Sequence, residues 1–499
     1  MKSRNILIAI AVGAAVSSCK KSFVDIQPQG QFLSENYYKN QDQAYAALVA
    51  AYDPVRKNSG GFENMLALMN SGSDDHVTGG GSSTDGNQLQ AFSNYTMTAN
   101  LMAASYWNDP YQGIFRANVL LQKLPKVPMD DNLKARFEAE AKALRAFYYF
   151  NLVRMFKNVP LLLEPLTATN IFQVEQAKPE DVYAQIEKDL TEAINALPAT
   201  LSLATEAGRL TKGAAKALLG KVYLYDKKNA LAAQQLADVN GPTPGGTSTY
   251  GYKLLTKFSD LWVPSNKFNT ESIFEETHSA QGNSDWGFWG SGRDEGNTFN
   301  VMVGPRSYER VDNTAPDLPS GWSFLVFTQN FVDFMKNDPR YAATVMDLNA
   351  LGSKVKYTPG YMNTGYFLNK FLPRKSDVST GGGASELNFR QNSYIIRLAD
   401  TYLMEAEALG ATGARAQALL DAVRTRAGLP SIPVSMNAIK NERRAELAGE
   451  GHRWFDLVRW GDAPAVLGSR GFKAGKHEVF PIPFRELQGT KLIQNPDYQ

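Results

Sequence analysis

Residues 442–461 read ERRAELAGEGHRWFDLVRWG, which sets charged side chains around two tryptophans. The regular spacing predicts one helix with a charged face and an apolar face. Glu450 with Arg453, and Asp456 with Arg459, stand three residues apart and carry opposite charges, so each couple can pair along such a helix. The apolar face would be made of Ala445, Leu447, Ala448, Trp454, Leu457, Val458 and Trp460.

The charged face has a structural and a catalytic interpretation. In the catalytic one, Glu446 and Glu450 act as acid and base one turn apart. Neither a metal-binding histidine pair nor a phosphate-binding loop accompanies these carboxylates. We therefore expect a partly buried network of ion pairs with a structural role.

Residues 442–461 resemble the signature of the SusD/RagB family, ER-x-x-EL-x-x-EG-x-R-x-x-DL-x-RWG, which lies close to the C-terminus of its members. Further blocks agree: EAKALRAFYYFNLVRMFKNVPLL from Glu140, YIIRLADTYLMEAEAL from Tyr394, and the closing PIPFREL and QNPDY. One position departs, since Asp497 stands where the family usually has glycine. The matching signature residues are Glu442, Arg443, Glu446, Leu447, Glu450, Gly451, Arg453, Asp456, Leu457, Arg459, Trp460 and Gly461.

The N-terminus has the pattern of a lipoprotein signal peptide. Lys2 and Arg4 precede an apolar run over residues 6–16, and Val16-Ser17-Ser18 leads to Cys19. The run is shorter than the about 20 residues that a membrane-spanning helix needs. We expect cleavage after residues 1–18 and an acyl anchor, such as palmitate, on Cys19. Cys19 is the only cysteine, so an intramolecular disulfide is excluded. The alternative is a secretory signal with a chance cysteine.

The charge balance argues against nucleic-acid binding. The whole chain has 52 basic and 50 acidic residues, and removing residues 1–18 takes away only Lys2 and Arg4. The mature surface is then close to neutral and lacks the basic stripe that nucleic acids require. No later apolar stretch reaches membrane-spanning length, so we expect a soluble body tethered by lipid.

Composition divides the mature chain into three regions. Residues 19–240 are rich in alanine and leucine and form the predicted N-terminal helical scaffold. Residues 241–390 are rich in glycine, proline, asparagine, serine and aromatics, which predicts a loop-rich ligand-binding insertion. The helical pattern returns at Tyr394, so residues 391–499 form the predicted C-terminal scaffold with the signature. At this length more than one structural region is expected.

Helical periodicity predicts an all-α scaffold of helix pairs. Two segments look like copies of one helix–turn–helix unit, KALLGKVYLYDKKNALAAQQLADV from Lys216 and IRLADTYLMEAEALGATGARAQALLDAVRTRAG from Ile396. These units resemble tetratricopeptide repeats. The family resemblance implies that they form a superhelical scaffold, interrupted by a large irregular, loop-rich insertion with short strands. The predicted helices are 41–55, 107–123, 132–156, 179–197 and 211–227.

Arg424 and Arg426 allow two interpretations. They form an anion site, or they stabilise the negative end of the helix that Gly428 closes. Basic side chains in a last helical turn commonly do the second. We therefore expect a structural role for both arginines.

The insertion contains aromatics that a helical core does not need. In GNSDWGFWGSGRDEGN, Trp286, Phe288 and Trp289 stand among glycines, which excludes a stable helix. Exposed flat rings stack well on the apolar face of a sugar. The alternative is that the rings cover the surface of the scaffold. Polar neighbours that could bind sugar hydroxyls are Asn283, Asp285, Arg293 and Asp294.

Arg306, Tyr308 and Trp322 extend this set, and turn residues in PSGWSF place Trp322 at the surface. Trp107, by contrast, matches a family helix motif with Tyr111, Ile114 and Asn118, so we expect it to be structural.

Asp74 and Asp75 lie in the Gly/Ser-rich segment SGSDDHVTGGGSSTDG. The family resemblance implies that this loop comes close to the ligand, where carboxylates accept hydroxyl hydrogens. Together with Asp85 they could instead hold calcium, but their spacing does not fit an EF-hand. The third possibility is a solvated loop.

Catalytic motifs are absent from the sequence. The four histidines are scattered, and HExxH, GxSxG and GK[ST] motifs are missing. We expect no cofactor and no metal. The resemblance implies an outer-membrane lipoprotein for nutrient uptake and polysaccharide utilization, which binds a glycan and delivers it to a SusC-like TonB-dependent transporter. The alternatives are a surface glycoside hydrolase that uses Asp285 and Asp294, and a periplasmic helical-repeat scaffold that binds protein segments. Peptide in place of glycan is a further possible cargo.

Overall fold

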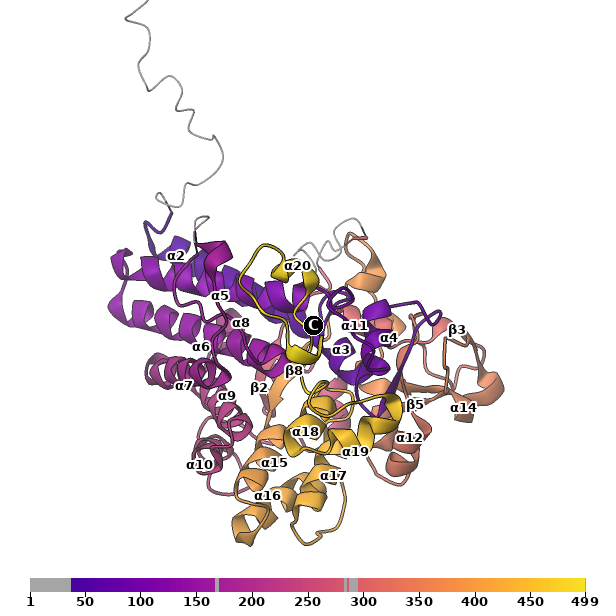
Figure 1. Cartoon of the computed structure of the whole chain (residues 1–499). Helices are drawn as coiled ribbons and strands as arrows, with labels where there is room; N and C mark the ends of the chain where they lie inside the picture. The colour runs from indigo at the N-terminus through magenta and orange to yellow at the C-terminus, as the bar shows by residue number, and fades with distance from the viewer. Residues whose placement is uncertain (1–36, 167–169, 282–284, 287–294, 499) are drawn as a thin grey trace, which may run out of the picture.

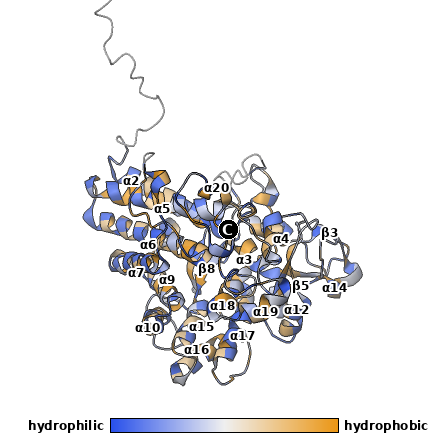
Figure 2. Ribbon diagram, in the orientation of Figure 1, coloured by the Kyte–Doolittle hydropathy of each residue, from blue (hydrophilic) through white to orange (hydrophobic). Residues whose placement is uncertain are grey.

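The computed structural model describes residues 37–166, 170–281, 285–286 and 295–498 (Figure 1). The predicted signal peptide and Cys19 lie outside these residues. The described chain is mainly helical, and its helices carry both hydrophobic and hydrophilic residues (Figure 2). The predicted fold class is confirmed.

The N-terminal scaffold helices begin and end close to their predicted bounds. Asn40, Asp130 and Thr211 cap three of them, because each side chain accepts a hydrogen bond from a backbone N–H of the first turn. Pro179 opens another helix, where its missing N–H costs nothing. The elements of this half are α2 Gln41–Tyr52, α3 Met65–Ser71, α4 Asn87–Ser93, α5 Ser105–Lys123, α6 Asp131–Phe156, α7 Pro179–Ala196, α8 Leu203–Glu206, α9 Lys212–Tyr225 and α10 Asn229–Asn240.

The two predicted repeat units are helix pairs. The first consists of α9 and α10, and the second of α15 Leu398–Ala408 and α16 Gly413–Arg426. Gly220 allows α9 and α10 to approach, since a Cβ there would lie 2.6 Å from Cγ of Leu236. Helix α10 then packs on α15, which joins the two units into one array.

The strands are short and pair over long sequence distances. Within the described residues they form two-stranded antiparallel sheets, and two of these sheets pair a strand of residues 241–390 with a strand outside that range. The pairs are β1 His76–Gly79 with β4 Phe324–Phe327, β2 Ser272–Glu276 with β8 Ser393–Arg397, β3 Arg306–Arg310 with β6 Val355–Thr358, and β5 Val345–Asp347 with β7 Tyr366–Leu368.

The predicted start of the second helix pair is wrong. The sequence predicts helix from Tyr394, but β8 runs to Arg397 and α15 begins only at Leu398. The aromatic and β-branched residues Tyr394, Ile395 and Ile396 suit a strand, and β2 supplies a partner. The remaining helices are α11 Thr298–Met302, α12 Gln329–Met335, α13 Tyr341–Thr344, α14 Leu348–Leu351, α17 Met436–Glu446, α18 Arg453–Trp460, α19 Ala463–Leu467 and α20 Phe484–Leu487.

The signature stretch is two helices, so the prediction of one continuous helix is wrong. Helix α17 ends at Glu446 and α18 begins at Arg453. Between them Gly449 and Gly451 adopt left-handed φ values of 76° and 77°, which side chains disfavour. A Cβ on Gly449 would also lie 2.4 Å from Leu368.

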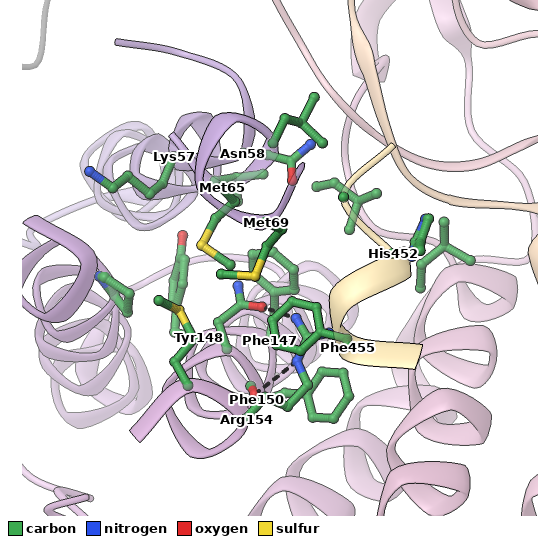
Figure 3. Close-up of a pocket in the computed structure, with 18 of the residues that line it drawn as sticks. Lys57, Asn58, Met65, Met69, Phe147, Tyr148, Phe150, Arg154, His452 and Phe455 are labelled. Atoms are coloured by element: carbon green, nitrogen blue, oxygen red, sulfur yellow. Dashed lines mark hydrogen bonds between the residues drawn. The ribbon is translucent and has the colours of Figure 1, made fainter. Parts of the chain in front are cut away.

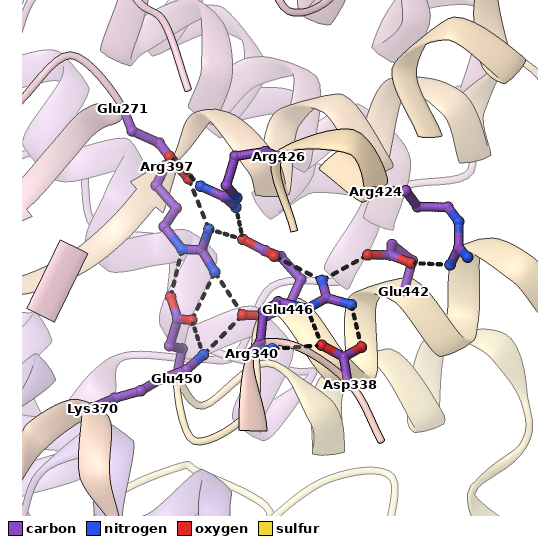
Figure 4. Close-up of polar contacts among 10 residues, drawn as sticks. All are labelled: Glu271, Asp338, Arg340, Lys370, Arg397, Arg424, Arg426, Glu442, Glu446 and Glu450. Carbon is purple, nitrogen blue, oxygen red and sulfur yellow. Dashed lines mark hydrogen bonds and ion pairs between the residues drawn. The ribbon is translucent and has the colours of Figure 1, made fainter. Parts of the chain in front are cut away.

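The break places Glu446 and Glu450 in a buried ion-pair cluster (Figure 4). Glu446 accepts hydrogen bonds from Arg340 at 2.8 Å and Arg397 at 2.6 Å, and it also binds Arg426. Burial alone would raise the pKa of Glu446, but the three arginine charges outweigh burial and hold the pKa well below its usual value. The cluster consists of Glu271, Asp338, Arg340, Lys370, Arg397, Arg424, Arg426, Glu442, Glu446 and Glu450.

The structural interpretation of the charged face is thus confirmed, although one predicted pair is wrong. Asp456 pairs with Arg459 at 2.8 Å, as predicted. Glu450 instead binds Arg397 and Lys370, each at 2.8 Å, because the break turns it away from Arg453.

The two arginines at the end of α16 belong to the same cluster. Arg424 pairs with Glu442 at 2.9 Å and Arg426 with Glu271 at 2.7 Å. Gly428, with a φ of 78°, follows the helix end as predicted. Their charges are thus used inside the protein, which agrees with the expected structural role.

Candidate functional site

Three aromatic rings from distant parts of the chain form a surface that we call the aromatic platform. Its members are Phe62, Trp286 and Trp322. Trp286 is 49% exposed, and its ring centroid lies 5.8 Å from that of Trp322 with the planes tilted by 35°. Phe62 continues the row at 6.1 Å from Trp322. The rings therefore present a curved apolar surface in a loop region.

Close backbone contact fixes the position of Trp322. Gly321 lies so near Gly304 that a Cβ on Gly321 would come within 2.4 Å of the Gly304 Cα, so only glycine fits. The backbone N–H of Trp322 donates to the carbonyl oxygen of Val301 at 2.9 Å. The sequence PSGWSF thus places its tryptophan by backbone packing.

Polar groups surround the platform. Arg306 donates to the carbonyl oxygen of Trp322 at 2.8 Å and lies 3.7 Å from the carboxylate of Asp85. The Trp286 Nε1 donates to Glu386 at 2.9 Å. Carboxylates and a guanidinium beside exposed rings are the groups that fix the orientation of a polar ring-shaped ligand.

The predicted site residues divide into four groups, of which Asp74 and Asp75 are the last. Trp286, Trp322 and Arg306 come together on the platform. Trp289 and Arg293 lie outside the described residues. Tyr308 does not reach the platform, because it is buried and its hydroxyl donates to the carbonyl oxygen of Pro316 at 2.6 Å. The irregular register of β3 with β6 allows Arg306 and Tyr308 to lie in different surroundings.

Asp74 and Asp75 are held by ion pairs with the signature stretch. Asp74 accepts two hydrogen bonds from Arg453, at 2.8 and 2.9 Å, and Asp75 accepts one from Arg444 at 2.7 Å. Burial would raise the pKa of Asp74, but the bonds and charge of Arg453 outweigh it and lower the pKa. This geometry favours a structural role over the ligand-binding role that we predicted.

Sequence reasoning missed Phe62 and Glu386 as members of the site. Phe62 follows Gly60 and Gly61, and a glycine-flanked aromatic is the signal that singled out Trp286. Glu386 carries no comparable signal, because its role depends on a contact with a residue 100 positions away.

A small internal cavity lies inside the scaffold and is too small for a sugar (Figure 3). Its volume is about 70 Å³, and Lys57, Met65, Arg154 and His452 are among the lining residues. A cavity of about 150 Å³ accepts benzene, so this one has room only for water. Burial lowers the pKa of His452 to about 3, which keeps the ring neutral.

The described part of the chain contains neither a cluster of metal-ligand side chains nor a membrane-spanning helix. There, no three or more His, Cys, Asp or Glu side chains are grouped to hold a metal ion. Among the same residues, no helix is both long and apolar enough to cross a membrane.

Comparison with known proteins identifies the family. The model of the SusD family matches residues 340–498, and a model described as starch-binding associating with outer membrane matches residues 31–224. A solved structure described as a laminarin binding SusD-like protein is 61% identical, covers 92% of this chain and 100% of its own, and superposes with a TM-score of 0.91. The chain belongs to the SusD/RagB family.

Other relatives of this SusD-family protein span most of its length. Surface glycan-binding protein A from Bacteroides thetaiotaomicron, solved in complex with laminarihexaose, is 27% identical over 91% of this chain and 99% of its own, with a TM-score of 0.81. SusD-like protein P25 from Formosa agariphila is 24% identical over 100% of this chain and 99% of its own. The resemblance read from the signature is therefore confirmed.

Proposed function

We propose that this SusD-family protein is a non-catalytic glycan-binding lipoprotein at the bacterial cell surface. Cys19 anchors it to the outer membrane, and it delivers oligosaccharide to a SusC-like TonB-dependent transporter. The observation that carries the proposal is the platform, where Trp286 and Trp322 offer neighbouring tilted rings beside Asp85, Arg306 and Glu386. Rings of this kind stack on the C–H faces of pyranoses, and the polar groups bind the hydroxyls.

The ligand that we propose is laminarin, a β-1,3-linked glucan. Two similar structures are described as binding laminarin or as a complex with laminarihexaose. The tilt of 35° between the two tryptophan rings also suits a curved glucan chain better than a flat ribbon. Each ring would hold one sugar of the curve.

The mechanism is reversible binding followed by transfer. Stacking on Trp286 and Trp322 holds the sugar faces, while Glu386 and Asp85 accept hydroxyl hydrogens and Arg306 donates to hydroxyl oxygens. Capture followed by transfer requires an affinity that still permits release, so we expect dissociation constants between micromolar and millimolar. The carboxylates of the platform orient the ligand and perform no bond cleavage.

Titration calorimetry of the purified mature protein with laminarihexaose tests the binding. We expect saturable binding, its loss in Trp322→Ala, and no new reducing ends after long incubation. Cleavage that follows the protein through purification, and disappears in Asp285→Asn or Asp294→Ala, would favour the hydrolase instead. The absence of binding to laminarihexaose would contradict the proposed ligand.

Fractionation of cells tests the anchor. A buried acyl chain contributes about 0.8 kcal/mol per CH₂ group, so Cys19→Ala is expected to leave a folded protein in the soluble fraction when the transporter gene is deleted. Protease treatment of intact cells tests the location. A surface protein is digested, whereas the periplasmic scaffold of the alternative stays intact.

A further inference from the structure

An apolar groove lies on another part of the surface, between α5, the segment after α6, and α20. We call it the α5–α20 groove, and its volume is about 480 Å³. Trp107, which is 4% exposed, and Ile114 form the floor. Phe115 and Phe172 form the walls and are 48% and 56% exposed. Two half-exposed phenylalanines facing one groove are an unusual feature for a surface without a ligand.

The edge of this groove is polar. Asn108, Gln112 and Gln488 line it together with the aromatic residues. All three side chains are exposed, and within the described part of the chain their amides make no hydrogen bond to another residue. Aromatic walls with free amides match a ligand that has both C–H faces and hydroxyl groups. Sugar hydroxyls can replace the water that these exposed amides bind, whereas a purely apolar occupant cannot.

Another hollow adjoins the groove and extends towards Phe62 of the aromatic platform. This middle hollow has a volume of about 660 Å³ and is lined by Glu63, Asn87, Gln88 and Arg485, among others. Arg485 also lines the α5–α20 groove. At the other end, Glu63 follows Phe62 of the platform.

The contact at that end is close. Gly86, which precedes Asn87, lies against the platform, since a Cβ there would be 3.2 Å from the Phe62 ring. The platform, the middle hollow and the groove therefore follow one another on the protein surface.

We infer that the α5–α20 groove is a second glycan-binding subsite for the far part of a long chain held on the platform. Phe115 and Phe172 supply stacking surfaces, and the three free amides bind hydroxyls. The inference rests on the proposed function and deepens it, because it assigns a preference for long oligosaccharides. A short oligosaccharide occupies the platform alone, whereas a long one also fills the groove.

Calorimetry with laminaritriose and with long laminarin oligosaccharides tests the inference. The double variant Phe115→Ala/Phe172→Ala removes the walls. We expect wild-type protein to bind long chains about tenfold more tightly than the trisaccharide, and the double variant to lose this difference. Binding of the trisaccharide is expected to stay unchanged in the double variant. The matched control is Leu231→Ala, which truncates an apolar side chain on α10 that is 43% exposed.

Two outcomes would overturn the subsite and leave the proposed function intact. One is equal affinity of the wild type for short and long chains. The other is a double variant that keeps the full preference for long chains. A double variant that changes only self-association or transporter binding, measured by sedimentation and by co-purification with the transporter, would likewise overturn it. If even the wild type binds neither short nor long chains, the proposed function itself fails.

Discussion

The buried ion-pair cluster and the aromatic platform are both built from residues that stand out in the sequence, yet their environments are opposite. In the cluster, Glu446 and Arg397 are buried and bind each other. On the platform, Trp286 is half-exposed and stands beside polar groups on loops. The family signature therefore marks the residues that hold the fold together, while the glycine-flanked aromatics mark the surface that we propose for binding.

The connections of the cluster explain why its residues form a motif. Arg340 and Lys370 come from residues 241–390, and both bind carboxylates of the signature stretch. Arg397 comes from β8 and reaches the same carboxylates. Removing one charge from this cluster leaves its partners buried without a counter-charge, which strongly lowers the stability of the fold. A substitution on the platform is expected to have no comparable effect on stability, because water can take the place of the ligand there.

Of the substitutions considered, Glu446→Gln is expected to have the largest effect on the stability of the fold. The change keeps the shape of the side chain but removes the negative charge between three arginines, at an expected cost of about 3–5 kcal/mol in the free energy of unfolding. Chemical denaturation measures the cost. The control is Glu309→Gln, which breaks the exposed pair with Lys356 and is expected to cost less than about 1 kcal/mol. Equal effects of the two variants would contradict the structural role of the cluster.

Trp454→Ala tests the apolar side of the same stretch. Trp454 is 1% exposed and packs on Phe92 and Phe480, with ring centroids 5.3 Å apart in each case. Truncation of such a side chain costs about 3–5 kcal/mol. In thermal melts, we expect a large drop in melting temperature for Trp454→Ala and a small drop for Trp454→Phe. A melting temperature close to that of the wild type would show that this packing contributes little.

Acidification is expected to destabilise the core gradually. Burial lowers the pKa of His76 from 6.5 to about 4, so between these pH values the unfolded chain binds a proton that the folded chain does not. The contribution of neutral His76 to the free energy of unfolding is therefore complete above pH 6.5 and is lost as the pH falls towards 4. Denaturation at several pH values measures the slope, which His76→Asn is expected to reduce. An unchanged slope in that variant would exclude His76 as the cause.

Glu386→Gln is expected to have the smallest effect and to act on binding alone. The side chain still accepts from Trp286 Nε1 but loses its charge. A hydrogen bond to a neutral acceptor is weaker by about 1 kcal/mol, so laminarihexaose affinity is expected to fall several-fold. The melting temperature is expected to stay constant. A large drop in melting temperature would show that Glu386 stabilises the fold, which would contradict a role in binding alone.

The sequence predicted the local features of the fold well and its long-range contacts poorly. The signals that start and stop a helix lie beside it in the sequence, and the predicted helix 179–197 therefore agrees with α7 Pro179–Ala196. The break at Gly449 and the strand β8 depend on Leu368 and on β2, which are distant in sequence. Periodicity alone carries no information on such partners.

The same limit applies to the candidate site. Trp286 and Trp322 could be predicted because their glycine and proline neighbours exclude helix, which is a local signal. The ion pairs of Asp74 and Asp75 join residues more than 360 positions apart, and no local pattern indicates them. The burial of Tyr308 follows from an irregular strand register that the sequence does not indicate either.

Thermal melts and laminarihexaose titrations of Glu446→Gln and Trp286→Ala, measured side by side, test the central claim that the fold is held by the ion-pair cluster and the ligand by the platform. We expect Glu446→Gln to lower the melting temperature. The molecules of this variant that remain folded are expected to keep the wild-type affinity for laminarihexaose. We expect Trp286→Ala to keep the melting temperature and to bind about tenfold to a hundredfold more weakly. A Trp286→Ala protein that melts as early as Glu446→Gln, or that binds laminarihexaose as tightly as the wild type, would contradict the account.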